Sequence, residues 1–256
     1  MSTVRVEREG RIAWLTMDRP DAANALSKAL VADLGAALAA LQADPPVLIL
    51  TGAGEKAFCA GADLKERRAM SLDETRAFLG ALNAMVDALA AHPQPVVAAL
   101  NGAAYGGGLE LALACDLRVA AEGIELGLPE VRLGIIPGAG GTQRLARACG
   151  VAVAKELILT GRRVPAARAR ELGLLSAVVP AAELRAEALR WATEIATAGP
   201  LAVAQAKAAI DAGFGQPLEA ALAVERAAYE VVLASEDRNE GLRAFAEKRK
   251  PNFTGK

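Results

Sequence analysis

The chain begins with apolar residues at every second position. Val4 and Val6 precede Glu9-Gly10, and Ile12 and Trp14 follow it. A spacing of two residues is the period of a β-strand, and glycine favours a tight turn. The segment up to Thr16 is therefore predicted to be a β-hairpin.

A helical pattern follows the hairpin. Its apolar positions are Leu26, Leu30, Leu34, Leu38 and Leu41. A spacing of three or four residues places these leucines on one face, which predicts an amphipathic helix. Asp44-Pro45-Pro46 is predicted to end the helix, because proline removes a backbone donor and clashes with the preceding turn.

Short apolar runs then alternate with further helical patterns. Buried strands are predicted at residues 47–51, 96–100 and 117–120. Helices are predicted at residues 72–91, 109–115, 143–148 and 154–160. Strands interleaved with helices are typical of an α/β domain.

The strand signal stops near Gly199-Pro200. The helices predicted beyond it cover residues 201–212, 218–235 and 240–248. We therefore expect an α/β body over residues 1–198, which holds the active site, and a helical region over residues 199–256.

Composition excludes several classes of protein. The 256 residues are 53% hydrophobic and 23% charged, which is enough to form a sizeable core. The net charge of −1 provides no general attraction to nucleic acid or to an anionic membrane. The three cysteines have no metal-ligand spacing, and the N-terminal residues include no apolar signal region. We expect a soluble, cytoplasmic protein without a membrane span.

The main chemical signal is a pair of glutamates beside two glycine-rich runs. Glu110 ends the first run, residues 101–110, and Glu130 lies at the start of the second, residues 128–144. Glycines let backbone N–H groups approach a ligand oxygen, and paired carboxylates commonly move protons. This combination predicts an enzyme that polarises a carbonyl and acts on the neighbouring carbons.

Each glutamate also has a simpler interpretation. Gly106-Gly107-Gly108 opens a helix whose free N–H groups form an anion site, and Glu110 follows Gly107 by about one turn. The alternative is a glycine bend packed on a strand, with Glu110 in solvent. Glu130 lies between Pro129 and an apolar stretch, which would desolvate it and raise its pKa. The alternative is an ordinary glutamate at a helix start.

A third segment, residues 58–66, contains the small residues Ala60, Gly61 and Ala62. These let the backbone pass close to a ligand, but they also fit a tight strand-to-helix turn with Asp63 as the N-cap.

Other signals are weak. The G-x-G-x-x-A match at residues 52–57 lacks a continuing helix, and no P-loop is present. His92 is the only histidine, so neither a zinc site nor a Ser-His-Asp triad is expected.

Taken together, these motifs resemble the enoyl-CoA hydratase/isomerase (crotonase) superfamily. The resemblance is carried by residues 58–67, by 101–110 and by Pro129-Glu130 with 136–144. It extends to Asn24-Ala25-Leu26 and to residues 240–249, so it covers nearly the whole chain. It implies a spiral of ββα units and a C-terminal helical trimerisation region, often within a hexamer of two trimers.

The resemblance also implies roles for individual residues. The backbone N–H groups of Ala62 and Gly107 would hold a thioester oxygen, and Glu110 and Glu130 would be catalytic. Substrate contacts would fall on Ala60, Ala62, Asp63, Leu64, Lys65, Gly107 and Gly138. Leu64, Met70, Leu72 and the C-terminal helices would wall the acyl pocket. Coenzyme A is part of the substrate, and no cofactor or metal is implied.

The two glutamates favour one branch of the superfamily. Hydratases use both, whereas isomerases generally keep only the carboxylate at the position of Glu130. The expected activity is therefore addition of water to a 2-enoyl-CoA thioester. The residues around 61–67 and 108–118 also resemble methylglutaconyl-CoA hydratases, some of which bind AU-rich RNA. RNA binding is not expected, because residues 25–43 contain only one lysine, Lys28. An inert scaffold with the same fold is a third interpretation.

Overall fold

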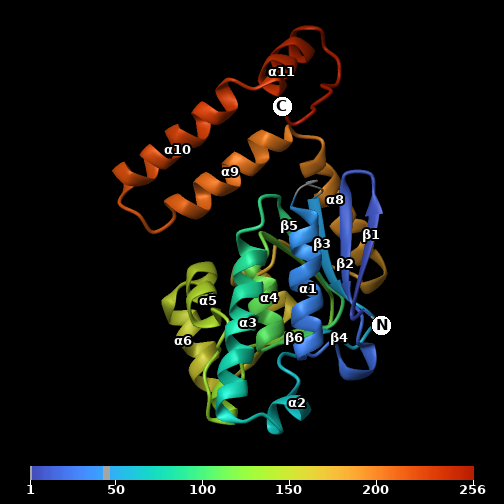
Figure 1. Cartoon of the computed structure of the whole chain (residues 1–256), viewed down its shortest axis with the longest axis vertical. Helices are drawn as coiled ribbons and strands as arrows, with labels where there is room; N and C mark the ends of the chain where they lie inside the picture. Colours follow the sequence, from blue (N-terminus) through green and yellow to red (C-terminus); the bar gives the residue numbers. More distant parts are fainter. Residues whose placement is uncertain (1, 43–46) are drawn as a thin grey trace.

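The computed structural model describes residues 2–42 and 47–256, so the predicted helix end at residues 44–46 lies outside the described residues. Two sheets organise the chain (Figure 1). The larger contains, in spatial order, β1 (Val4–Glu9), β2 (Ile12–Met17), β3 (Val47–Gly52), β5 (Val96–Leu100), β7 (Leu117–Ala121) and β10 (Ala177–Val179). The smaller contains β4 (Ala57–Cys59), β6 (Ala103–Tyr105), β8 (Glu125–Gly127) and β9 (Arg163–Pro165).

The larger sheet is parallel except for its first strand. β1 runs antiparallel to β2, with Glu9 opposite Ile12, so the predicted hairpin is confirmed. Gly10 has φ +59°, a left-handed conformation that glycine adopts at little cost. The remaining neighbours in this sheet pair in parallel. Parallel strands need crossover connections, and the helices between them provide these.

Apolar side chains project from both faces of the larger sheet. Leu48 and Leu50 of β3 join the main core, while Val47 and Ile49 point into a second core. The helix α8 (Leu184–Ala196) packs on that second face through Leu184. The sheet is thus buried on both sides, which explains the continuous apolar runs in its strands.

Further helices cover the other face or connect the strands. Their bounds are α1 (Lys28–Leu41), α2 (Leu64–Arg68), α3 (Leu72–Ala90), α4 (Gly107–Ala114), α5 (Gly141–Cys149), α6 (Val151–Thr160) and α7 (Ala166–Glu171). Short 3₁₀ helices occur at η1 (Pro20–Ala22), η2 (Glu130–Leu133) and η3 (Ala181–Glu183). The helices predicted near residues 72–91, 109–115, 143–148 and 154–160 are confirmed. Together with the parallel sheet they confirm the α/β class.

The first helix begins later than its leucine pattern indicates. Ser27 is its N-cap, and the Ser27 hydroxyl accepts a hydrogen bond from the Leu30 N–H at 3.1 Å. Leu26 is fully buried but lies before the helix, in a parallel bridge with Ala62. A capping serine satisfies the free N–H groups of the first turn, so the helix starts where the cap lies.

The smaller sheet brings distant segments together. Each of its strands has three residues. At Gly108 an added Cβ would collide with the carbonyl of Cys59, so only glycine lets the start of α4 lie against the end of β4. This close packing joins the segment after β4 to the glycine run that follows β6.

The C-terminal region contains α9 (Pro200–Gly213), α10 (Leu218–Leu233) and α11 (Glu236–Ala246), which confirms the three predicted helices. The last begins four residues earlier than predicted, because Ser235 caps it through the Arg238 N–H. Figure 1 shows α9 and α10 as an antiparallel pair that extends away from the sheets. Among the described helices, none combines the length and apolarity needed to cross a bilayer.

Candidate active site

A cavity of about 600 Å³ lies where the loops after β4, β6 and β8 meet. Most of the residues predicted to form the site line this cavity: Ala60, Ala62, Leu64, Gly107, Glu110, Glu130 and Gly138. Segments up to 103 residues apart in the chain, from Ala60 to Arg163, thus contribute to one cavity wall.

Two predicted residues, Asp63 and Lys65, lie outside the cavity wall. Asp63 is the N-cap of α2 and accepts hydrogen bonds from the N–H groups of Lys65 and Glu66. It also forms an ion pair with Arg19 at 3.0 Å. Burial alone would raise the pKa of Asp63, but the hydrogen bond from Arg19 and those from the backbone lower it overall. The N-cap interpretation of this segment is confirmed, and Lys65 is exposed on the helix.

Two residues of the cavity wall, Ala62 and Gly107, have backbone N–H groups close to one another. The Leu26 N–H donates to the Gly61 carbonyl and the Asp63 N–H donates to the Leu26 carbonyl, so the N–H of Ala62 between them is left over. Within residues 2–42 and 47–256, neither Ala62 nor Gly107 has an acceptor for its N–H. A Cβ built on Gly107 would lie 3.8 Å from the Ala62 nitrogen, so both groups border one small space.

Glu110 is buried, with 2% of its surface exposed, so the alternative of a solvated glutamate is wrong. Its Oε1 accepts hydrogen bonds from the N–H groups of Ala139 at 2.8 Å and Gly141 at 2.7 Å. Burial raises the pKa of Glu110, and these two hydrogen bonds and the charge of Arg144 offset part of that rise. The second glycine-rich run therefore wraps around the carboxylate of the first.

Glu130 begins η2 directly after Pro129, so it lies at a helix start and is also buried, with 9% of its surface exposed. Its Oε2 has no hydrogen-bond partner among the described residues. Burial, with a smaller contribution from the charge of Glu110, raises the pKa of Glu130 from 4.5 to about 7. A Cβ on Gly106 would lie 2.9 Å from the Glu130 Oε1, so the absence of a side chain at Gly106 leaves room for the carboxylate.

Much of the cavity wall was not identified in the sequence. The additional lining side chains are Arg67, Leu79, Leu82, Tyr105, Leu133, Ile135, Ile136 and Arg163. Leu79 and Leu82 fit the core pattern of their helix, and Arg163 belongs to a three-residue strand with no motif. Of the expected acyl-pocket residues only Leu64 lines the cavity. Met70 and Leu72 do not, and no described residue beyond 198 does.

Comparisons with known proteins agree with this geometry. The sequence profile of the family described as enoyl-CoA hydratase/isomerase matches residues 7–256. The mouse protein named enoyl-CoA hydratase domain-containing protein 2, mitochondrial, is 49% identical over 251 residues, covering 96% of this chain and 85% of the relative. The enoyl-CoA isomerase/hydratase fer4 of Mycosarcoma maydis is 47% identical over 252 residues, covering 94% of this chain and 92% of the relative.

A solved structure gives the same answer for the fold. The crystal structure of enoyl-CoA hydratase from Bacillus anthracis superposes with a TM-score of 0.97 at 48% sequence identity, covering 99% of this chain and all of that one. The fold expected from the sequence motifs is confirmed. The chain belongs to the enoyl-CoA hydratase/isomerase family.

Proposed function

We propose that this protein adds water across the α,β-double bond of 2-enoyl-CoA thioesters. The observation that supports this most directly is the pairing of two buried carboxylates, Glu110 and Glu130, with two unused N–H groups in one cavity. Coenzyme A enters as part of the substrate, so the chemistry needs no other organic group.

The thioester oxygen is proposed to accept hydrogen bonds from the N–H groups of Ala62 and Gly107. As water attacks the β-carbon, electron density moves onto that oxygen and the α-carbon gains enolate character. Donors that are already oriented stabilise this charge, and one such donor typically contributes roughly 10²–10³-fold in kcat. Because these two groups have no competing acceptor in the described residues, they are available without breaking the fold.

The two glutamates divide the proton transfers. Glu110 is proposed to act as the carboxylate that takes a proton from water, while the water oxygen bonds to the β-carbon. Glu130, with its pKa raised to about 7, donates its proton to the α-carbon. The proton on Glu110 then returns to Glu130 through solvent. A general acid works best when its pKa lies near the working pH.

The first test is to mix the purified protein with crotonyl-CoA and follow the ultraviolet absorbance of the conjugated thioester. A rapid loss of absorbance, with 3-hydroxybutyryl-CoA as the product, is expected. An unchanged spectrum with crotonyl-CoA and with longer or branched 2-enoyl-CoA thioesters would overturn the hydratase assignment. An inert scaffold predicts that result.

Enoyl-CoA isomerase is the second candidate activity. Moving a double bond needs one group that carries a proton between two carbons, and Glu130 has a carboxylate oxygen without a partner among the described residues. A 3-enoyl-CoA thioester, incubated under the same conditions, distinguishes the two activities. Gain of conjugated absorbance without hydroxyacyl product would favour the isomerase.

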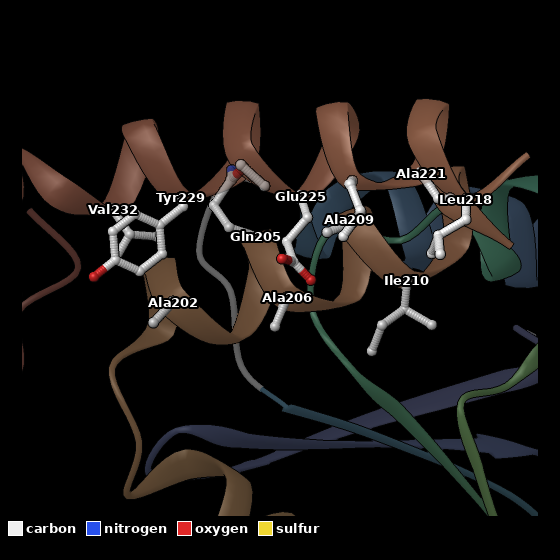
Figure 2. A pocket seen from close by; sticks show the side chains of 13 residues that line it. Ala202, Gln205, Ala206, Ala209, Ile210, Leu218, Ala221, Glu225, Tyr229 and Val232 are labelled. Carbon is white, nitrogen blue, oxygen red and sulfur yellow. The ribbon is translucent and has the colours of Figure 1, made fainter. Parts of the chain in front are cut away.

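The helices α9 and α10 are proposed to pack against other copies of the chain, as a trimer or a hexamer of two trimers. A groove of about 580 Å³ lies along the pair, and Figure 2 shows residues that line it. Ile210 and Leu218 in this groove are 68% and 74% exposed, and a contiguous exposed apolar patch often marks a protein–protein contact. The boundary at residue 198 stays a prediction. A cytoplasmic location also stays a prediction, and the mouse relative is named mitochondrial.

The number of chains in the oligomer can be measured directly. Light scattering after gel filtration is expected to give three or six times the 26.4 kDa chain mass. Leu218→Glu should shift the mass towards that of a single chain, because a charge cannot be buried unpaired at an apolar contact. Substituting Glu219, which lies outside the groove, with glutamine is the matched control and should leave the mass unchanged. A monomeric wild-type protein would contradict the proposal.

A further inference from the structure

Arg144 links the glycine-rich run at residues 138–141 to α3. It lies in the first turn of α5, and only 24% of its side chain is exposed. Its Nη1 donates to the Ala139 carbonyl at 2.9 Å, and its Nη2 donates to Oδ1 of Asp87 at 2.9 Å. Because the guanidinium is planar and rigid, these two hydrogen bonds hold the side chain in one orientation.

The loop that Arg144 contacts is the one that binds Glu110. The N–H groups of Ala139 and Gly141 donate to Glu110 Oε1. The Ala139 carbonyl, which lies between them along the chain, accepts from Arg144. The chain has only two soft dihedral angles per residue, so this carbonyl cannot move far without moving the N–H groups on either side.

The same loop is tied to α3 at a second point. Asn83 lies four residues before Asp87 on one face of that helix, and its Nδ2 donates to the Gly138 carbonyl at 2.9 Å. This carbonyl and the Ala139 N–H belong to one peptide group, so Asn83 fixes a group that donates to Glu110. The helix α4, which carries Glu110, packs against both α3 and α5 (Figure 1). Two helices thus hold the loop against a third.

Two glycines of the loop leave room for the side chains on it. A Cβ on Gly141 would lie 2.8 Å from Glu110 Oε1, and a Cβ on Gly140 would overlap the Arg144 guanidinium. Gly140 also has φ +91°, a conformation that glycine adopts at little cost. The glycines at this point of the run therefore allow close packing of Glu110 and Arg144.

One oxygen of Glu110 is held and the other is available. Both hydrogen bonds end on Oε1, and within residues 2–42 and 47–256 no group donates to Oε2. A carboxylate that takes a proton needs one oxygen within hydrogen-bond reach of it, and a misplacement of about 1 Å can lower the rate about 10²-fold. The direction of Oε2 depends on how firmly Oε1 is held.

We propose that Arg144 is a positioning residue for Glu110. It fixes the loop of residues 138–141, and the N–H groups of that loop fix the carboxylate. This inference rests on the proposed hydratase activity, in which Glu110 takes a proton from water. Arg144 is not a lining residue of the site cavity, so it acts on the reaction through Glu110 and not by touching the substrate there.

The charge of Arg144 acts on the same carboxylate. Burial raises the pKa of Glu110, two backbone hydrogen bonds oppose this rise, and the charge of Arg144 opposes it as well. Among the described groups around it, Arg144 is the cation that favours the charged form of Glu110. The other ionisable groups that adjoin Glu110, Arg144 or the start of α4 are Glu130 of η2, Asp87 of α3, Cys59 of β4 and Tyr105 of β6.

The test compares Arg144→Met in two backgrounds. In the wild-type background it is expected to lower kcat for crotonyl-CoA hydration roughly 10–100-fold, the scale of a misplaced catalytic group. In the Glu110→Gln background it should lower kcat by no more than about threefold, because the carboxylate that Arg144 positions is already gone. Single-turnover assays with excess enzyme keep the slow variants measurable. Arg147→Met is the matched control and should leave kcat unchanged, because Arg147 is exposed on the same helix and donates to Gln143 of that helix.

The pH dependence gives a readout that a general loss of stability would not move. Glu110 is proposed to act as the carboxylate, so kcat/KM should fall as the pH drops through its pKa. Removing the positive charge in Arg144→Met raises that pKa, so the fall should begin at a higher pH than in wild type. Arg144→Lys keeps the charge but not the two-armed geometry. It should lower kcat without moving the fall, and it goes through the same two-background comparison in case Arg144→Met does not fold.

The remaining outcomes overturn the proposal or the function separately. An equal loss of kcat in both backgrounds, a kcat within about threefold of wild type, or an unmoved fall in Arg144→Met shows that Arg144 does not position Glu110. If wild type hydrates no enoyl thioester, the proposed function fails instead. Carbon-13 NMR of the Glu110 carboxyl, assigned by its loss in Glu110→Gln, then still tests Arg144. Its titration should move to higher pH in Arg144→Met, and an unchanged titration contradicts the proposal.

Discussion

Glu130→Gln is expected to lower kcat for hydration roughly 10²–10⁴-fold, the usual contribution of a positioned general acid or base. Glutamine keeps the size and polarity of the side chain but has no proton to give to the α-carbon. KM should change little, because the N–H groups of Ala62 and Gly107 are proposed to hold the thioester and are unaltered in this variant. Steady-state kinetics with crotonyl-CoA measure both constants.

The pH profile gives this prediction a second readout. Since Glu130 is proposed to act in its protonated form and its pKa is about 7, wild-type kcat/KM for hydration should fall as the pH rises through about 7. The residual activity of Glu130→Gln should not fall as the pH rises through about 7. A variant that keeps more than a tenth of the wild-type kcat, or a wild-type profile that is flat between pH 6 and pH 8, would contradict the role.

The melting temperature of Glu130→Gln shows whether the variant has lost its fold, and the direction of the expected change can be worked out. The folded-state pKa of Glu130 is raised, so its proton is bound more tightly in the folded than in the unfolded chain. Its contribution to stability is fully present below about pH 4.5 and is lost as the pH rises to about 7. Glu130→Gln should therefore melt no lower than wild type at pH 8, where the buried carboxylate is charged.

Ala62→Pro is expected to lower kcat roughly 10²–10³-fold by removing one of the two N–H donors. The substitution deletes no hydrogen bond among the described residues, because only the neighbouring Leu26 and Asp63 N–H groups are used there. Gly61 has φ +91°, outside the right-handed helical region that proline disfavours in the preceding residue. Single-turnover kinetics with saturating crotonyl-CoA isolate the chemical step.

Ala62→Gly is the matched control for the proline variant. It removes the methyl group but keeps the N–H, so kcat should stay within a few-fold of wild type. Circular dichroism of both variants checks that α2, which begins just after this position, is intact. Equal losses in the glycine and proline variants would show that the side chain matters and would remove the N–H of Ala62 from the proposed mechanism.

Most of the long elements were predicted from the sequence, but the 13-residue helix α8 and the whole of the small sheet were not. Val47 to Leu50 form an uninterrupted apolar run because both faces of β3 are buried, and that run is easy to recognise. β4, β6, β8 and β9 are three residues long, which is less than two full periods of alternation. Their pairing depends on tertiary contacts such as that of Gly108 with Cys59. Local pattern therefore located five of the six strands of the larger sheet, all but β10, and missed the smaller sheet that positions the site.

The same distinction applies to the site residues. Glu110 and Glu130 stood out because charged residues interrupt glycine-rich and apolar segments. Asp63 and Lys65 were placed at the cavity on resemblance alone, but Asp63 has a capping role that its position at the start of α2 explains. Arg67 and Tyr105 lie within the motif segments 58–67 and 101–110 but were assigned no role, and Arg163 lies outside every motif; the cavity wall forms only when these distant segments meet.

The contact between Gly108 and Cys59 has a consequence for how such a protein can diverge. Any side chain at Gly108 would force α4 away from β4 and separate the two N–H groups, so no single substitution there preserves the site. The wall residue Ile136, which is 69% exposed, has no such constraint on its size. The cavity wall can thus change one residue at a time, whereas the contact that keeps the two N–H groups together cannot.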